Sequence, residues 1–436
     1  MKDISYSLFF AFLILLSGCK QKGEDKNYSP TEEISHQPTG PQYTARYDRT
    51  KPVEMIDVES AISTSSDVRL SEVASTIEYF QVGDDKYPVT DVVAVDGGFI
   101  ALNQPKLYLY RQGQKRKRVG LKTKYGDWKM AIFSNHKLYY DKATTKLYAQ
   151  LKKLDPETGY STKFIAELPP LDSVLARKHY LYPDSVPNRY PLKDWAEIFT
   201  SEIYARRFSY PGTGFDYGMT TFNLKNDTLC NFYAGIDSFG IIKDDNFYNF
   251  VLYSTSYLYD NKVTFTATYC DTVYRLSDHQ TITPVYNIHL GKYRASALYI
   301  FHRGDKRNKA WVDDLKENPK GVFLKVHREG KSSKSGWLDN KNKENRDFPS
   351  EDYLMVYLKN KRQTRALPLK AIGMTNDLDG GLPFWPDGQT DEYMYMIRPA
   401  KDLKQRIKLT GSPKQESLKK FLSDLPDNQN VMIVIK

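Results

Sequence analysis

The clearest pattern of strand residues lies in the central part of the chain, between Asn246 and Lys292. Short runs rich in Tyr, Phe, Thr, Val and Ile alternate there with polar segments such as Asp260-Asn261, and such side chains suit a half-buried pleated surface. We therefore expect an antiparallel meander with strands at Phe247–Tyr253, Lys262–Tyr269, Thr272–Leu276 and Ile282–Ile288. Four strands in about 45 residues is the size of one propeller blade.

Strand and turn signals recur from Pro52 onward at intervals of about 8–12 residues. Asp96-Gly97-Gly98 is typical of a tight hairpin turn, because glycine adopts a positive φ at little cost. The first strands are expected at Val53–Val58 and Ile77–Val82, and the last at Val431–Ile435. A chain that begins and ends in strands can close a ring of blades by pairing its two ends, so the pattern predicts an all-β propeller.

Three segments depart from this regularity. Leu192–Phe208 has apolar residues at helical spacing and predicts an amphipathic helix over one face of the fold. Lys331–Phe348 is polar and predicts an inserted loop. Near the C-terminus, Ser412 and Pro413 are typical of the start of a short helix, which would place Leu418, Phe421 and Leu422 on one apolar face.

The N-terminus has the layout of a secretory signal. The apolar run Leu8–Leu16 is too short to span a bilayer, which takes ~20 residues. It leads into Leu16-Ser17-Gly18-Cys19, which resembles a bacterial lipobox and implies cleavage before Cys19 and acylation of that cysteine. An ordinary signal peptide with an incidental cysteine is the alternative. We expect residues 1–18 to be a lipoprotein signal peptide and the mature chain to be anchored in the lipid bilayer through Cys19.

Residues 19–51 contain few aliphatic side chains and many charged, Pro, Gly, Ser and Thr residues, which is typical of a lipidated flexible tether. The propeller domain is then expected at residues 52–436. Lys20, directly after the anchor cysteine, lacks the acidic side chain that retains many lipoproteins at the inner membrane. This favours the outer membrane, and both its periplasmic face and the cell surface stay open.

The formal net charge of +10 would suggest nucleic acid as a partner in a cytoplasmic protein. A secretory signal excludes that partner, and an anionic surface or a glycan remains. The Gly212-x-Gly214 pair lacks the context of a dinucleotide fingerprint, so we expect no cofactor. No CxxC, HExxH or spaced His/Cys cluster is present, so we expect no metal site. Cys230 and Cys270 lie within expected strands, where buried free cysteines are common, although pairing stays open.

Several segments together resemble the six-bladed β-propeller lipoproteins of Bacteroidetes, a family of unknown function. The resemblance covers residues 52–436, and its carriers are Val263–Phe265, Tyr269–Tyr274, Pro284–Lys292, Asp377–Pro386 and Asn430–Val434. It implies an all-β fold with six blades, with seven or eight as alternatives, and short helical insertions. The Gly-Pro-Gly-Glu loop that the family usually has after its first blade is absent, since residues 120–128 read GLKTKYGDW.

A ligand-binding loop is expected at Asp377–Pro386. Phe384 and Trp385 stand between two prolines, and Asp377 and Asp379 precede them, so a stiff indole beside carboxylates could stack on a sugar ring. The alternatives are that Trp385 fills the core and that the two aspartates cap backbone amides in a turn. Trp337, in the polar insertion, is a second candidate.

Three functions fit these observations. We favour an envelope lipoprotein whose propeller face binds a glycan or an envelope protein. A carbohydrate-active hydrolase or lyase of the envelope is an alternative, but no catalytic motif or spaced carboxylate pair is recognised, so we identify no catalytic residues. A structural assembly module is the third, because fold alone does not determine function.

Overall fold

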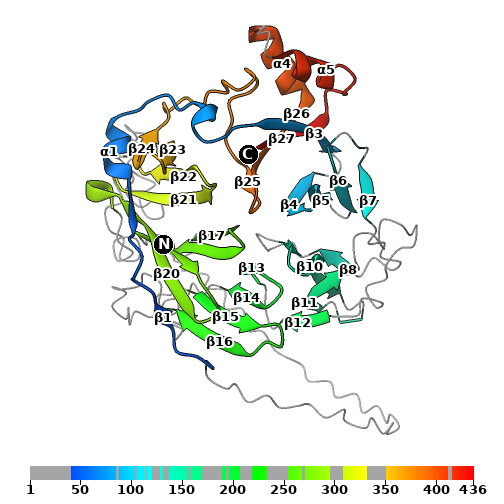
Figure 1. Ribbon diagram of the computed structural model, residues 1–436, viewed down its shortest axis with the longest axis vertical. Coiled ribbons are helices and arrows are strands. Elements are labelled where there is room, and N and C mark those ends of the chain that lie inside the picture. The colour runs from blue at the N-terminus through cyan, green and yellow to red at the C-terminus, as the bar shows by residue number, and fades with distance from the viewer. Residues whose placement is uncertain are drawn as a thin grey trace, which may run out of the picture. The chain divides into compact units, whose positions relative to one another are not determined.

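Six β-sheets, within the part of the chain that the structure describes, stand around a common centre (Figure 1). This computed structural model describes residues 41–436 except for 85–87, 104–105, 113, 115, 120–127, 131–136, 155–156, 159, 169–188, 193–195, 207–218, 233–253, 268–270, 295–307, 331–349 and 411–414. The blades are built mainly from antiparallel pairs of strands that follow one another along the chain, and the strands nearest the centre in Figure 1 include β17, β21 and β25. The prediction of an all-β, six-bladed propeller is therefore confirmed.

The blades follow one another along the chain. The first blade comprises β4 (Val89–Val95), β5 (Gly98–Asn103), β6 (Lys106–Tyr110) and β7 (Lys117–Val119), and the second comprises β8 (Trp128–Met130), β9 (Leu138–Asp141), β10 (Lys146–Leu154), β11 (Ser161–Leu168) and β12 (Arg189–Leu192). The third comprises β13 (Ile198–Phe199), β14 (Ile203–Arg206), β15 (Met219–Asn223) and β16 (Thr228–Phe232), and the fourth comprises β17 (Ser254–Tyr259), β18 (Lys262–Ala267), β19 (Thr272–Leu276) and β20 (Thr281–His289). The fifth comprises β21 (Ala310–Glu317), β22 (Gly321–Arg328), β23 (Glu351–Leu358) and β24 (Gln363–Ala366).

The sixth blade closes the ring by joining the two ends of the folded unit. It contains β25 (Gly388–Gln389), β26 (Met394–Pro399), β27 (Gln429–Ile435) and, from the start of the chain, β3 (Ile77–Asp84). β27 is almost wholly buried and pairs antiparallel with β3, with Ile435 opposite Ile77. The predicted closure by terminal strands is confirmed.

The chain before β3 runs along the outside of the blades. β1 (Arg46–Tyr47) and β2 (Glu54–Asp57) both pair in parallel with β20, and the helix α1 (Val58–Ser63) and the 3₁₀ turn η1 (Leu70–Glu72) follow. Upstream of β1, the Tyr43 amide donates to the Leu229 carbonyl at 2.9 Å. The compact unit accordingly runs from Gly40 to Lys436 and includes the last residues of the expected tether.

The hairpin turns form where the sequence predicts them. Asp260 and Asn261 both have positive φ, at 52° and 55°, and join β17 to β18 with the backbone twist of a tight hairpin. Three of the four expected strands of this meander are present as β18, β19 and β20. The remaining expectation, Phe247–Tyr253, lies outside the described residues, and the strand that pairs with β18 is β17.

The helix predicted for Leu192–Phe208 is wrong. The described residues of this segment form the end of β12 and the hairpin β13–β14, in which Phe199 stands opposite Tyr204. The Thr200 amide closes the turn by donating to the Ile203 carbonyl at 2.8 Å. Apolar residues that recur every three or four positions here serve a sheet, because β14 has β15 as a neighbour and buries Tyr204 and Ala205 in the blade.

Besides α1, which lies beside β24 of the fifth blade, the described residues contain two α-helices at the edge of the sixth blade (Figure 1). They are α4 (Ala400–Thr410), which was not predicted, and α5 (Glu416–Leu422), whose buried Leu418 and Leu422 match the expected apolar face. The expected start at Ser412 and Pro413 lies outside the described residues. A further 3₁₀ turn, η3, spans Gly291–Tyr293. None of the helices in the described ranges has the length and apolar character needed to cross a membrane.

Polar side chains tie neighbouring blades together where the inner strands leave backbone groups unpaired. The Gln150 side chain both donates to and accepts from the backbone of Ala196 in the next blade, at 3.0 Å each. The Asp91 carboxylate accepts from the amides of Lys137 and Leu138, at 2.7 and 2.8 Å. Each tie satisfies buried polar groups that would otherwise cost about 1–3 kcal/mol apiece.

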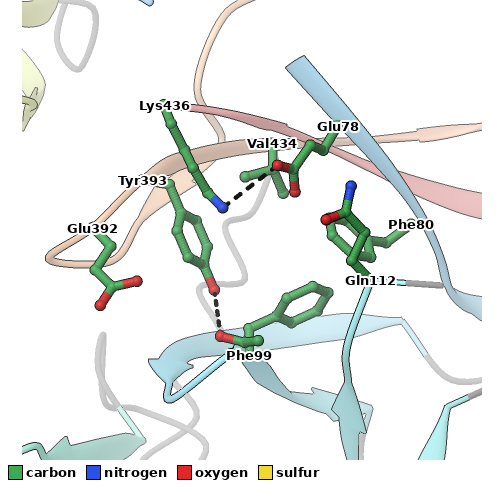
Figure 2. Close-up of a pocket in the computed structure, with 10 residues that line it drawn as sticks. Glu78, Phe80, Phe99, Gln112, Glu392, Tyr393, Val434 and Lys436 are labelled. Atoms are coloured by element: carbon green, nitrogen blue, oxygen red, sulfur yellow. Dashed lines mark hydrogen bonds and ion pairs between the residues drawn. The ribbon is translucent and has the colours of Figure 1, made fainter. Parts of the chain in front are cut away.

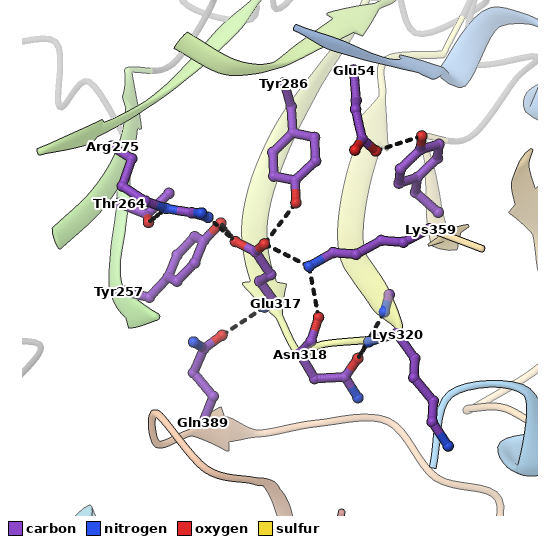
Figure 3. Close-up of polar contacts among 12 residues, drawn as sticks. Glu54, Tyr257, Thr264, Arg275, Tyr286, Glu317, Asn318, Lys320, Lys359 and Gln389 are labelled. Carbon is purple, nitrogen blue, oxygen red and sulfur yellow. Dashed lines mark hydrogen bonds and ion pairs between the residues drawn. The ribbon is translucent and has the colours of Figure 1, made fainter. Parts of the chain in front are cut away.

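A larger group of polar contacts surrounds Glu317, at the end of β21 (Figure 3). This carboxylate is 2% exposed and accepts from Tyr286 at 2.6 Å, Lys359 at 2.7 Å, Arg275 at 2.5 Å and Tyr257 at 3.0 Å. Burial and the neighbouring carboxylate raise the pKa of Tyr257, so its hydroxyl remains a donor. The cluster joins the fourth and fifth blades, and a buried carboxylate with this many partners serves the scaffold.

Candidate functional site

Two of the residues expected to form sites, Cys19 and Trp337, lie outside the described residues. The other three, Asp377, Asp379 and Trp385, lie on one segment between β24 and β25. Asp377 contacts the residues before β3, Asp379 contacts β3 itself, and Trp385 contacts β22.

The two aspartates hold this segment against the start of the folded unit. Asp377 accepts from the Ser71 amide at 3.0 Å and from its hydroxyl at 2.6 Å. Partial burial raises the pKa of Asp377, but the hydrogen bonds from Ser71 outweigh it and keep that pKa below its usual range. Asp379 accepts from the Tyr79 hydroxyl on β3 at 2.6 Å and from the Gly381 amide at 2.9 Å. Both carboxylates are therefore engaged in contacts within the protein.

The aromatic pair of this segment packs into the core. Phe384 is fully buried and exchanges two backbone hydrogen bonds with Met374. Trp385 is half-buried and meets Phe323 of β22 edge to face, with ring centroids 5.9 Å apart. Such pairs stabilise a core by about 0.5–1.5 kcal/mol beyond the area they bury.

A pocket of about 230 Å³ lies between the sixth blade and the first, and we call it the seam pocket (Figure 2). Its lining combines aromatic rings with charged and amide groups: Glu78, Phe80, Gly97, Gly98, Phe99, Gln112, Glu392, Tyr393, Val434 and Lys436. The segments that contribute these residues are brought together by ring closure.

The strands on each side of the seam determine which side chains face the pocket. Glu78 and Phe80 are two positions apart on β3, so they point to the same face of the sheet. On the other side, the β4–β5 turn needs glycine, because Gly97 has φ of 69° and a Cβ at Gly98 would overlap the Tyr110 carbonyl oxygen. This turn places Phe99 directly at the pocket wall.

The aromatic wall is held rigid by its own contacts. Phe99 stacks on Tyr110 with centroids 4.8 Å apart and meets the edge of Phe80 at 4.9 Å. The Tyr393 hydroxyl donates to the Gly98 carbonyl at 3.4 Å (Figure 2). Burial, followed by the Glu392 carboxylate, raises the pKa of Tyr393 well above its ordinary value, so the hydroxyl stays protonated.

The charges at the pocket rim are balanced. Lys436 Nζ lies 3.6 Å from Glu78 Oε1, and Lys142 Nζ from the second blade lies 2.8 Å from Glu392 Oε1. Burial lowers the pKa of Lys142, but its bonds to Glu392 and Asp391 outweigh this and raise it. Because both lining carboxylates, Glu78 and Glu392, have a lysine partner, which Glu392 shares with Asp391, the rim offers hydrogen-bond donors and acceptors with much of its charge offset.

A second hollow of about 490 Å³ lies beside the predicted loop. Its lining consists of Ile372, Leu382, Pro383, Arg398, Asp402, Gln405 and Arg406. It contains no aromatic ring among these described residues, so it lacks a flat surface on which a sugar could stack.

The sequence predicted none of the residues of the seam pocket as ligand-binding. The sequence does predict the Asp96-Gly97-Gly98 turn and the strands that contain Glu78 and Val434, and these local elements are confirmed. The sequence does not predict that β3 and the β4–β5 turn lie side by side, because no short motif encodes a contact between distant segments.

Comparisons with known proteins concern the fold. A family model described as "Domain of unknown function (DUF4933)" matches residues 38–409, and no curated protein matches the chain. A putative exported protein from Bacteroides fragilis has a TM-score of 0.52 at 12% identity, over 88% of this chain and 99% of its own. A member of the DUF4221 family from Bacteroides vulgatus has a TM-score of 0.37 at 11% identity, over 84% of this chain and 97% of its own. PorZ, a surface component of the type-IX secretion system of Porphyromonas gingivalis, has a TM-score of 0.24 at 9% identity, over 74% of this chain and 43% of its own.

Proposed function

The chain belongs to the DUF4933 family of unknown function, and from this premise we propose that it is an exported, membrane-anchored protein that binds a carbohydrate in the seam pocket. The six-bladed propeller agrees with the resemblance seen in the sequence, and the lipoprotein part of that resemblance belongs to the proposal. Export and anchoring rest on the apolar run Leu8–Leu16 and on Cys19, and the side of the outer membrane is left to experiment.

The observation that carries the proposal is the pairing of an immobile aromatic wall with a charge-balanced polar rim. Sugar rings present an apolar face of C–H groups and an edge of hydroxyls, which match the half-buried ring of Phe80, supported from behind by Phe99, on one side and Glu392 and Gln112 on the other. The volume of about 230 Å³ is below the ~300–1,000 Å³ of pockets for drug-sized ligands, so one sugar unit at the end of a glycan is the expected occupant.

A glycan array followed by calorimetric titration of the best ligand tests the proposal. Gln112→Ala and Glu392→Gln should each weaken binding by about tenfold, which is about 1.4 kcal/mol, because the first removes a polar contact at the rim and the second removes the charge that strengthens one. The matched control is Glu416→Gln on α5, an exposed carboxylate paired with Lys419 at 2.7 Å and outside the pocket. It should bind like the unaltered protein.

Two outcomes would contradict the proposal. One is a folded protein that binds no glycan on the array, in which case binding partners should be sought among envelope proteins, as expected for an assembly module. The other is a glycan whose affinity is the same in all three variants, which would place the site elsewhere. Cleavage of the bound glycan, followed by mass spectrometry of the products, would instead identify a hydrolase or lyase.

A further inference from the structure

Three strands of the fifth blade bring a histidine and two aspartates together outside the seam pocket. Asp313 comes from β21, His327 from β22 and Asp352 from β23. One ligand atom from each of them lies within 4.8 Å of the others. His327 and Asp313 are half-buried and Asp352 is exposed, so the group is open to solvent on one side.

The strand register accounts for this meeting. His327 stands directly opposite Asp352 on β23 and opposite Trp311 on β21. The β21–β22 register shifts between Val312 and Asp314, so Asp313 is the extra residue of a β-bulge. Bulges re-aim a side chain out of the regular alternation, and here the bulge residue is the third member of the group.

Side chains around the group hold its members in orientations suited to a metal ion. His327 Nδ1 lies 2.8 Å from Asp352 Oδ1, while the opposite ring nitrogen, Nε2, lies 3.6 Å from a separate carboxylate oxygen on Glu329. Trp311 Nε1 donates to Asp313 Oδ1 at 2.8 Å. Metal-binding histidines and carboxylates commonly have such outer partners, which set the imidazole tautomer and the carboxylate orientation.

We propose that Asp313, His327 and Asp352 bind one divalent transition-metal ion, with His327 Nδ1 and one oxygen of each aspartate as ligands. One imidazole nitrogen with two carboxylate oxygens is a donor set for Zn²⁺ or a similar ion, because Mg²⁺ and Ca²⁺ take oxygen ligands. The group and its neighbour Glu329 supply three carboxylates, and Lys325 offsets part of their charge, with its Nζ 3.5 Å from Asp352 Oδ2. The open side leaves room for water to complete the coordination.

Zn²⁺ titration of the full-length protein, purified without a histidine tag, tests this site. The unaltered protein should bind one Zn²⁺ per chain, and His327→Gln and Asp313→Asn should each weaken binding at least about tenfold. The matched control is His289→Gln: His289 Nε2 lies 3.3 Å from Glu59 Oε2 but belongs to no comparable group of three ligands among the described residues, so this substitution should leave Zn²⁺ binding unchanged. At the same Zn²⁺ concentration, the melting temperature of the unaltered protein should rise more than that of either variant.

Co²⁺ gives an independent readout, because its visible absorption reports nitrogen and oxygen ligands directly. If the unaltered protein takes up no more Zn²⁺ or Co²⁺ than His327→Gln does, the proposal is overturned and the group is an ion pair only. Mg²⁺ or Ca²⁺ binding that exceeds Zn²⁺ binding and survives His327→Gln would overturn it too, since the imidazole would then not be a ligand. If His327→Gln does not fold, Asp352→Asn tests the same site at a side chain that is 51% exposed.

Discussion

At the scale of single residues, Trp385 is the side chain whose role is most sharply testable. Its half-buried indole packs edge to face on Phe323, so Trp385→Ala should lower the free energy of unfolding by about 2 kcal/mol. Replacing a fully buried aromatic residue with alanine lowers the free energy of unfolding by about 3–5 kcal/mol. The value expected for Trp385→Ala is smaller because part of its ring is exposed to solvent. Urea denaturation measures the loss. Carbohydrate affinity, titrated below the unfolding transition, should be unchanged.

The conservative variant Trp385→Phe provides the control, because it keeps an aromatic ring against Phe323 and should lose less stability than the alanine variant. A contrary result would be a Trp385→Ala protein with unaltered stability that no longer binds the glycan. That combination would return the binding site to the loop at Asp377–Pro386, as the sequence first predicted.

At the scale of elements, the pairing of β27 with β3 determines whether the ring stays closed. Deleting residues 431–436 removes most of an apolar strand and exposes the edges of β3 and β26, which β27 separates. We expect the truncated protein to lose its cooperative unfolding transition in differential scanning calorimetry, because the sixth blade can no longer form.

A shortened protein that begins at Arg49 is the matched control at the other end. It lacks β1, whose two exposed residues pair with β20 at the edge of the fourth blade, and the backbone hydrogen bond of Tyr43 to Leu229, but it keeps all strands of the six blades. It should keep a single cooperative transition near that of the full chain. An unaltered melting curve after the C-terminal deletion would show that closure by β27 is not needed for folding.

At the scale of the whole molecule, Cys19 is predicted to determine where the protein resides. Cys19→Ala removes the acylated thiol, so the protein should move from the detergent-soluble membrane fraction to a soluble or unprocessed form. Cell fractionation with immunoblotting measures the shift, and mass spectrometry identifies the acyl chains. The control is Cys230→Ala, which alters a buried thiol of the third blade, where burial raises the pKa to about 11. An unchanged membrane fraction for Cys19→Ala would exclude lipid anchoring.

The sequence by itself determined the local elements of this protein. Alternating apolar residues and turn pairs such as Asp260-Asn261 and Asp96-Gly97-Gly98 predict strands and hairpins, because they restrict φ and ψ within a few residues. The all-β fold and the closing strand at Val431–Ile435 followed from these patterns. The segment Leu192–Phe208 shows their limit, since its apolar spacing suits a helix as well as a hairpin.

Only the tertiary structure decided which distant residues meet. Leu192–Phe208 contains a hairpin and not a helix because β14 forms backbone hydrogen bonds with the neighbouring strand β15. In the seam pocket, Glu78 from the start of the folded unit pairs with Lys436 at the end of the sequence. The group of Asp313, His327 and Asp352 comes together through the strand register and one β-bulge. The physical reason is that backbone preferences act over a few residues, whereas pairing and packing between strands depend on every partner that the closed ring supplies.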